Sequence, residues 1–302
     1  MNKALELFHS LPEQEFPFDS RFLEVGGHQI HYLEEGSGPT LLLVHAGPGW
    51  SFVFRDLIER LRKDFRCVTL DFPGDGLSQA AEGWRPSLEL ASDVLERFII
   101  TLGLDDIGLV AHDLGGPISF GVLARRPERF RALTVLETFG WPLGTENPFV
   151  GRMLRLMGSA PMRRVNGATN MLPRLMVSSY SIGRHLSRDG KRAFLGPYRD
   201  HRVRRNALRM FGAAGRADDY MTEIEQGIRE ALATKPVLVI YGSKSPGIKE
   251  EQPERWMQRF PDARLRIIEG AHHFPMNDDP DEVAGELRSW WREVVEPSGG
   301  AG

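Results

Sequence analysis

The chain has 302 residues, 41% of them hydrophobic, and its 38 Lys and Arg against 41 Asp and Glu give a net charge of -3. A charge so close to balance argues against a nucleic-acid partner, and no apolar run approaches the length of a membrane span. The single cysteine, Cys67, excludes a disulfide framework and a thiolate metal cluster, and the N-terminal residues show no secretory signal pattern. We therefore expect a cytoplasmic protein that contacts neither nucleic acid nor membrane.

Short apolar segments alternate with amphipathic ones along the chain. Two alternating segments, at 21–25 and 28–36, flank Gly26 and Gly27 and predict an opening hairpin. Runs rich in Val, Ile and Leu predict six more strands, at 40–46, 66–72, 107–113, 132–138, 236–242 and 263–270. Amphipathic stretches such as 87–103 and 279–295 predict helices. This alternation predicts an α/β fold with a mostly parallel, eight-stranded sheet covered by helices on both faces.

One interval between the predicted strands is too long for a loop. Roughly a hundred residues without a strand pattern separate Thr138 from Lys235. We expect a helical cap at 139–234, inserted after the sixth strand into a core formed by 1–138 and 235–302. The cap holds sixteen Arg and Lys against eight Asp and Glu, and the core twenty-two against thirty-three. The expected cap is therefore basic and the expected core acidic.

A sharp turn is expected where the strand at 107–113 meets the helix that follows it. Ala111 and Gly115 stand two positions either side of Asp113, and such small flanking residues are typical of a nucleophile elbow, which holds its central side chain above the sheet. The usual residue at that centre is serine. An aspartate there is also suited to capping the helix, but the small flanking residues favour the nucleophile.

The order of the motifs resembles the α/β-hydrolase superfamily, and more narrowly its haloalkane dehalogenase and epoxide hydrolase branch. The matching segments cover nearly the full length and are FPFDSRFLEV, HYLEEGSGP, HAGPGWSFVFRDLI, DFPGDGLS, HDLGGPI, LETFGWP and GAHHFPMNDDP. The resemblance implies an α/β-hydrolase fold with a helical cap and an enzyme that needs no cofactor and no metal. We expect a small hydrophobic substrate; the sequence does not indicate the oligomeric state.

An aspartate nucleophile constrains the electrophile. Serine attacking a saturated carbon would form an ether, which is a dead end, whereas a carboxylate forms an alkyl ester that water can hydrolyse at the carboxyl carbon. Asp113 therefore predicts a substrate with an sp3 carbon bearing a leaving group.

The resemblance also identifies partners for Asp113. The family histidine stands directly before a Phe and seven residues before a Pro, which selects His273 rather than His272. One family location for the acid holds Ser245, which carries no charge, and the other holds Glu137, twenty-four residues beyond Asp113. We expect Asp113, His273 and Glu137 to form the catalytic triad, in which the acid orients the imidazole.

The motif HAGPGW resembles the loop that supplies an oxyanion hole. The resemblance assigns the hole to the backbone N–H groups of Gly47 and Leu114 and suggests a cis Gly47-Pro48 peptide. Dehalogenases usually hold the departing halide with side-chain N–H donors at these two positions, and neither residue here has one. Trp141 is a candidate donor, although a tryptophan at that place commonly packs. His45 and Trp50 are also expected to line the pocket.

An epoxide oxygen needs a proton donor instead, and relatives that open epoxides use cap tyrosines. The cap holds Tyr180, Tyr198 and Tyr220, and Tyr220 lies nearest the family position. Epoxide hydrolysis to a diol is therefore the favoured function. The alternatives are a haloalkane dehalogenase-like or β-lactone-cleaving hydrolase and, from a different class, a non-catalytic ligand-binding relative.

Overall fold

The computed structural model describes residues 15–45, 47–178, 181–245 and 251–296. Its strands form one sheet in the order β1-β2-β4-β3-β5-β6-β7-β8, in which β1 and β2 run antiparallel to their neighbours and all other pairs are parallel. The strands are β1 Arg21–Val25, β2 His28–Glu35, β3 Thr40–Val44, β4 Arg66–Leu70, β5 Ile107–His112, β6 Phe130–Leu136, β7 Val237–Gly242 and β8 Arg264–Ile268. The predicted fold class is confirmed.

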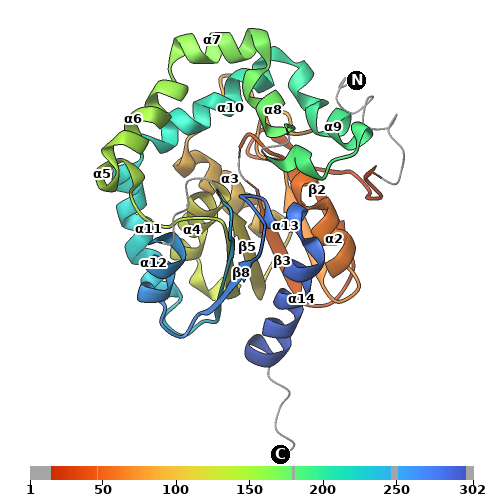
Figure 1. Ribbon diagram of the computed structural model, residues 1–302, viewed down its shortest axis with the longest axis vertical. Helices are drawn as coiled ribbons and strands as arrows, with labels where there is room; N and C mark the ends of the chain where they lie inside the picture. The colour runs from red at the N-terminus through yellow and green to blue at the C-terminus, as the bar shows by residue number, and fades with distance from the viewer. Residues whose placement is uncertain (1–14, 46, 179–180, 246–250, 297–302) are drawn as a thin grey trace, which may run out of the picture.

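Helices cover both faces of this sheet (Figure 1). Those of the core region are η2 Ser51–Phe54, α2 Arg55–Leu61, α3 Leu88–Thr101, α4 Gly115–Arg125, η3 Pro127–Arg129, α12 Glu251–Arg259, α13 Pro275–Asp278, α14 Pro280–Trp290 and the π-helical turn η6 Trp291–Val295. The start of α3 illustrates the local chemistry, because Ser87 accepts a hydrogen bond from the backbone N–H of Leu90 and so caps the helix.

Alternating side chains of each central strand enter two separate hydrophobic layers. In β5, Leu109 and Ala111 join the layer packed under α3, α4 and α12, whereas Val110 joins the layer under α2 and α14. This period of two is what a strand buried on both faces requires. The two layers hold the sheet from both sides. Because β3 to β7 run parallel, their carboxyl ends meet along one edge of the sheet.

A long helical segment separates β6 from β7. It contains α5 Leu143–Glu146, α6 Pro148–Met157, α7 Ala160–Thr169, α8 Met171–Met176, η4 Ile182–Arg184, α9 Arg188–Leu195, η5 Pro197–Arg199, α10 His201–Ala214 and α11 Asp218–Ala231. In Figure 1 α6 to α10 form an arch above the sheet. The last helix, α11, instead packs against α4, so the range 139–234 includes one helix that lies on the core layer. We call residues 139–234 the inserted segment.

Candidate active site

Asp113 occupies the turn between β5 and α4, and its backbone is left-handed, with φ of 47°. The chain can turn there only because Gly115 and Gly116, which follow shortly after, have no side chain. A Cβ on Gly115 would lie 2.3 Å from the carbonyl oxygen of Val44, and one on Gly116 would lie 1.9 Å from Oγ1 of Thr138. Thr138 also donates a hydrogen bond of 2.5 Å to the backbone carbonyl of Asp113. The elbow is therefore held by close packing and by β6 beside it.

His273 lies between two carboxylates. Its Nε2 is 3.3 Å from Oδ2 of Asp113 and its Nδ1 is 3.4 Å from Oε2 of Glu137. Burial lowers the pKa of His273, but the hydrogen bonds to Asp113 and Glu137 outweigh it and raise this pKa to about 10. Burial raises the pKa of Asp113, and the hydrogen bond from His273 more than reverses that and leaves it below its usual value. At neutral pH the resting group is therefore an imidazolium between two carboxylates.

Glu137 follows β6 and is the fully buried member of the three. It adopts a left-handed backbone, with φ of 51°, and its Oε1 accepts a hydrogen bond of 2.5 Å from the backbone N–H of Gly242. Its Oε2 accepts a second hydrogen bond of 2.8 Å from Oγ of Ser245. The two family locations for the acid therefore converge in space, and the serine at one of them supports the carboxylate at the other. A buried carboxylate needs such donors.

His112 contributes a contact that the sequence analysis missed. It precedes Asp113 on β5, is fully buried, and its Nε2 donates a hydrogen bond of 2.8 Å to the backbone carbonyl of His273. Burial, and then the charge of His273, lower the pKa of His112 to about 3, so its ring is neutral. A histidine at the end of an otherwise apolar strand was the available signal.

The loop after β3 lies beside the elbow. Gly47 and Leu114 are buried, and the Gly47-Pro48 peptide is cis. The backbone N–H of Leu114 favours the charged form of the Asp113 carboxyl and so lowers its pKa further, after the larger effect of the histidines.

The whole chain was also compared with known proteins. Residues 39–280 match the model of the alpha/beta hydrolase fold family. The chain belongs to the α/β-hydrolase family. It is 32% identical over 279 residues to haloalkane dehalogenase 2 of Mycobacterium tuberculosis, covering 91% of this chain and 95% of that protein, which places it in the haloalkane dehalogenase branch.

Two other similarities extend the comparison. The cis-3-alkyl-4-alkyloxetan-2-one decarboxylase of Shewanella oneidensis is 26% identical over 289 residues, covering 92% of this chain and 90% of that protein. A solved structure of a putative epoxide hydrolase mutant from Pseudomonas aeruginosa superimposes with a TM-score of 0.77 at 21% identity, covering 92% of this chain and 97% of that one. The structural similarity supports the fold of this α/β-hydrolase.

Two expected pocket residues of the hydrolase, His45 and Trp50, are fully buried beside the loop that holds Gly47. The ring of His45 packs edge-on against Phe72 at 5.4 Å between centroids. The indole Nε1 of Trp50 donates a hydrogen bond of 3.3 Å to the carbonyl of Phe194 in α9, so this N–H joins the core loop to the inserted segment. It is thus already engaged within the protein.

Two other residues were expected to donate a proton or a hydrogen bond to the leaving group, and they lie in different parts of the structure. Tyr220 lies on α11, and its hydroxyl donates to the carbonyl of Pro117 at 3.1 Å and lies next to Gly121, two turns into α4. The structure therefore does not bring Tyr220 to the triad, because α11 packs on the core layer. Trp141 is buried with its ring between Trp256 and the guanidinium of Arg255.

The two remaining cap tyrosines differ in how far they can be placed. Tyr198 is fully buried on η5. Tyr180 lies outside the described residues.

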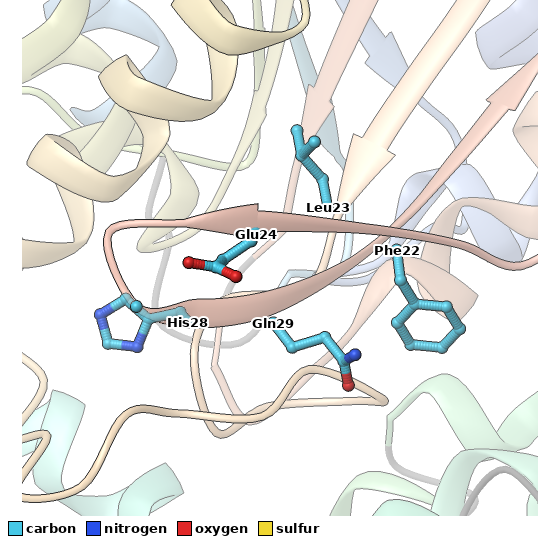
Figure 2. Close-up of a pocket in the computed structure, with 6 residues that line it drawn as sticks. Phe22, Leu23, Glu24, His28 and Gln29 are labelled. Carbon is cyan, nitrogen blue, oxygen red and sulfur yellow. The ribbon is translucent and has the colours of Figure 1, made fainter.

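A hollow elsewhere on the molecule is not part of this site. A cavity of about 280 Å³ is lined by Phe22, Leu23, Glu24, Gly27, His28 and Gln29 of the opening hairpin (Figure 2). In the sheet order this hairpin begins at the edge strand β1, four strands from β5, which carries Asp113. Its residues are therefore remote from the elbow.

The described residues also limit other classes of site. Within them, no helix combines the length and the apolar composition needed to cross a bilayer. Across the same residues, no three His, Cys, Asp or Glu side chains are grouped so that they could hold a metal ion.

Proposed function

We propose that the protein hydrolyses a substrate at an sp3 carbon through an alkyl ester on Asp113. The observation that carries this proposal is the placement of His273 within 3.3 Å of the Asp113 carboxylate and 3.4 Å of the Glu137 carboxylate. This is the arrangement of nucleophile, base and orienting acid that a covalent mechanism needs. The related dehalogenase and oxetanone decarboxylase support a hydrolase of this general class.

In the first step an oxygen of Asp113 attacks the carbon, and the bond to the leaving group breaks. Ester formation removes the negative charge of Asp113, which is one of the two charges that raise the pKa of His273. The pKa of His273 therefore falls, and the imidazolium loses its proton to solvent and becomes a base. Glu137 remains charged and keeps the ring in place.

In the second step His273 takes a proton from water, and the hydroxide attacks the carboxyl carbon of Asp113. Negative charge develops on the other carboxyl oxygen, and we assign its stabilisation to the backbone N–H groups of Leu114 and Gly47. The C–O bond to the alkyl group breaks and the alcohol leaves with a proton from His273. The carboxyl group of Asp113 then releases the proton that came with the hydroxide, and His273 takes a proton back from solvent, which restores the resting site.

For the leaving group we favour an epoxide oxygen. Leu114 and Gly47 have no side-chain N–H, and the indole N–H of Trp50 is hydrogen-bonded to Phe194. Each oriented donor missing from a dry site costs about 3–4 kcal/mol of transition-state stabilisation, which is a severe loss for a departing halide. An epoxide oxygen needs an acid instead.

The second candidate is cleavage of a carbon–halogen bond. It is favoured by the 32% identity to the mycobacterial dehalogenase. The buried Nε1 of Trp141, which has no hydrogen-bond partner among the residues described, is a donor that a halide could use.

The test separates the two steps. His273→Gln should still form the ester but hydrolyse it at least 100-fold more slowly, since the base is lost. Intact-protein and peptide mass spectrometry of this variant, offered matched terminal epoxides and bromides, should show a stable adduct on Asp113, with the epoxide adduct forming faster.

His272→Gln is the matched control, because it is His273 and not His272 that pairs with Asp113 and Glu137, and this variant should keep normal turnover. Absence of an adduct with every substrate that the wild-type protein consumes would refute the covalent mechanism. Faster adduct formation from the bromides would reverse the order of the two leaving groups.

A further inference from the structure

A second acidic side chain lies beside the candidate oxyanion loop. Asp75 belongs to the loop that follows β4, and its Oδ2 is 3.8 Å from the position that a Cβ on Gly47 would occupy. Asp75 is buried, with 8% of its surface exposed. The neighbouring Gly74 is in contact with Asn206 of α10, so this loop lies between the core and the inserted segment.

The hydrogen-bond donors of this loop serve Asp71 and leave Asp75 without one. Asp71 accepts from Nδ1 of His31 and from the backbone N–H groups of Ser51 and Leu77, at 2.7 to 2.8 Å. Burial raises the pKa of Asp71, but His31 outweighs it and holds this carboxyl charged. Across the described part of the chain, no residue donates a hydrogen bond to the Asp75 carboxyl.

Asp75 therefore keeps its proton at neutral pH. Burial, and then the negative charge of Asp71, raise its pKa to about 8. His45 lies near Asp71 and helps to keep Asp71 charged. A neutral carboxyl group has an O–H to donate, and in a water-excluded place that donor is costly unless something accepts it.

A second buried polar group, the hydroxyl of Tyr198, lies on the side of the inserted segment. The side chain of Tyr198 is fully buried, and its hydroxyl has no hydrogen-bond partner among the described residues. Burial, then the negative charge of Asp75, then that of Asp71 raise the pKa of this hydroxyl well above the usual value. Its ring packs 5.9 Å from that of Phe194, the residue whose carbonyl accepts the Trp50 indole N–H.

The Asp75 carboxyl group on the core side and the unpartnered Tyr198 hydroxyl on the side of the inserted segment thus lie beside the loop that holds Gly47 and Trp50. Buried polar groups in proteins almost always have partners, which here points to an oxygen atom of a ligand. Given the ester mechanism proposed above, on which this inference rests, we propose that Asp75 is the acid that protonates the leaving oxygen and that the Tyr198 hydroxyl hydrogen-bonds the same atom.

The step balances as follows for an epoxide. An oxygen of Asp113 forms a bond to the epoxide carbon, the carbon–oxygen bond of the ring breaks, and its electron pair stays on the ring oxygen. That oxygen takes the proton of Asp75, which leaves a hydroxyalkyl ester on Asp113 and a carboxylate on Asp75. Hydrolysis of the ester consumes one water and releases the diol and one proton, which restores Asp75.

The test measures ester formation alone, in the His273→Gln background, with terminal epoxides and the matching bromides. Adding Asp75→Asn keeps a hydrogen-bond donor but removes the transferable proton, so epoxide alkylation should slow about 100-fold or more while bromide alkylation changes little. Without this substitution, epoxide alkylation should fall as pH rises through about 8, and with it the pH dependence should disappear.

Tyr198→Phe gives a second measurement, with epoxide alkylation expected to slow about tenfold. Asp93→Asn and Tyr32→Phe are matched controls, because Asp93 is exposed on α3 and the Tyr32 ring packs against Phe98 under the sheet. An Asp75→Asn variant that alkylates epoxides at the original rate and pH profile would overturn the role of Asp75 and leave the ester mechanism standing. Absence of any adduct in His273→Gln would instead overturn the ester mechanism itself.

Discussion

Two pairs of acidic residues lie along the same edge of the sheet, and the protein treats them differently. Asp113 and Glu137 both face His273, which carries a proton between them, so both are paired with a cation. Asp71 and Asp75 share no such group, because His31 and two backbone N–H groups serve Asp71 alone. The comparison shows that the groups around a buried carboxyl group decide whether it is charged or neutral.

The largest effect should come from the first pair. Asp113→Asn removes the nucleophile, and turnover should fall about 10⁴-fold or more while the fold persists. Asparagine tolerates the left-handed backbone of the elbow, and the side chain is 24% exposed, so little packing is lost. Activity assays with circular dichroism check this. Wild-type turnover in this variant would mean that the Asp113 carboxylate, like that of Asp71, is not needed for the reaction.

The second pair should show its effect in stability. Asp71→Asn turns one accepting oxygen into a donor that faces existing N–H groups, and the free energy of unfolding should fall by about 3–5 kcal/mol, as when one partner of a buried ion pair is removed. Urea unfolding measures it. Asp93→Asn, at an exposed ion pair of 3.4 Å with Arg125, should change that free energy by no more than about 0.5 kcal/mol. Equal effects would mean that Asp71 is not structural.

The pH dependence of stability should separate Asp75 from the charged acids. The folded pKa of His273 is raised from 6.5 to about 10, so its stabilisation is complete below 6.5 and lost as pH rises through 10. Asp75, raised from 3.8 to about 8, contributes stability that is complete below 3.8 and lost as pH rises through 8. Each group contributes a slope of at most about 1.4 kcal/mol per pH unit.

Urea unfolding between pH 5 and pH 9 should therefore show stability that declines as the pH rises. Asp75→Asn should flatten the curve below pH 8, and His273→Gln should flatten it between pH 6.5 and 10. An unchanged curve in Asp75→Asn would show that Asp75 is ionised like Asp71.

The smallest effect should come from the support of Glu137. Ser245→Ala removes the hydrogen bond of 2.8 Å to Oε2, while the N–H of Gly242 still binds Oε1, so the hydrolysis rate should fall about tenfold, equivalent to about 1.4 kcal/mol. Ser243→Ala is the matched control, since Ser243 accepts from the N–H of Gly270 and does not contact Glu137. Equal hydrolysis rates in the two variants would show that Ser245 does not support the function of Glu137.

Much of the scaffold could be predicted from local pattern. The alternation of strands and the small residues around Asp113 are properties of neighbouring residues, and the structure shows why Gly115 and Gly116 must be small. The structure also brings His273 and Glu137, selected by resemblance, within 3.3 to 3.4 Å of their expected partners. The position of Ser245 at the unused acid location was visible, but its hydrogen bond to Glu137 was not.

The residues that the sequence placed poorly lie where distant elements meet. Tyr220 was near the expected position along the chain, yet α11 turns its hydroxyl to Pro117, because the helix packs on α4. The distinction between Asp71 and Asp75, four residues apart in one loop, depends on His31 from β2 and Tyr198 from the inserted segment. The sequence alone determined the fold and the tight turn at Asp113, because these follow from periodicity and from sterics within a few residues. Only the tertiary structure decided which acids are charged and which donors are unpaired, because burial and the supply of partners come from remote parts of the chain.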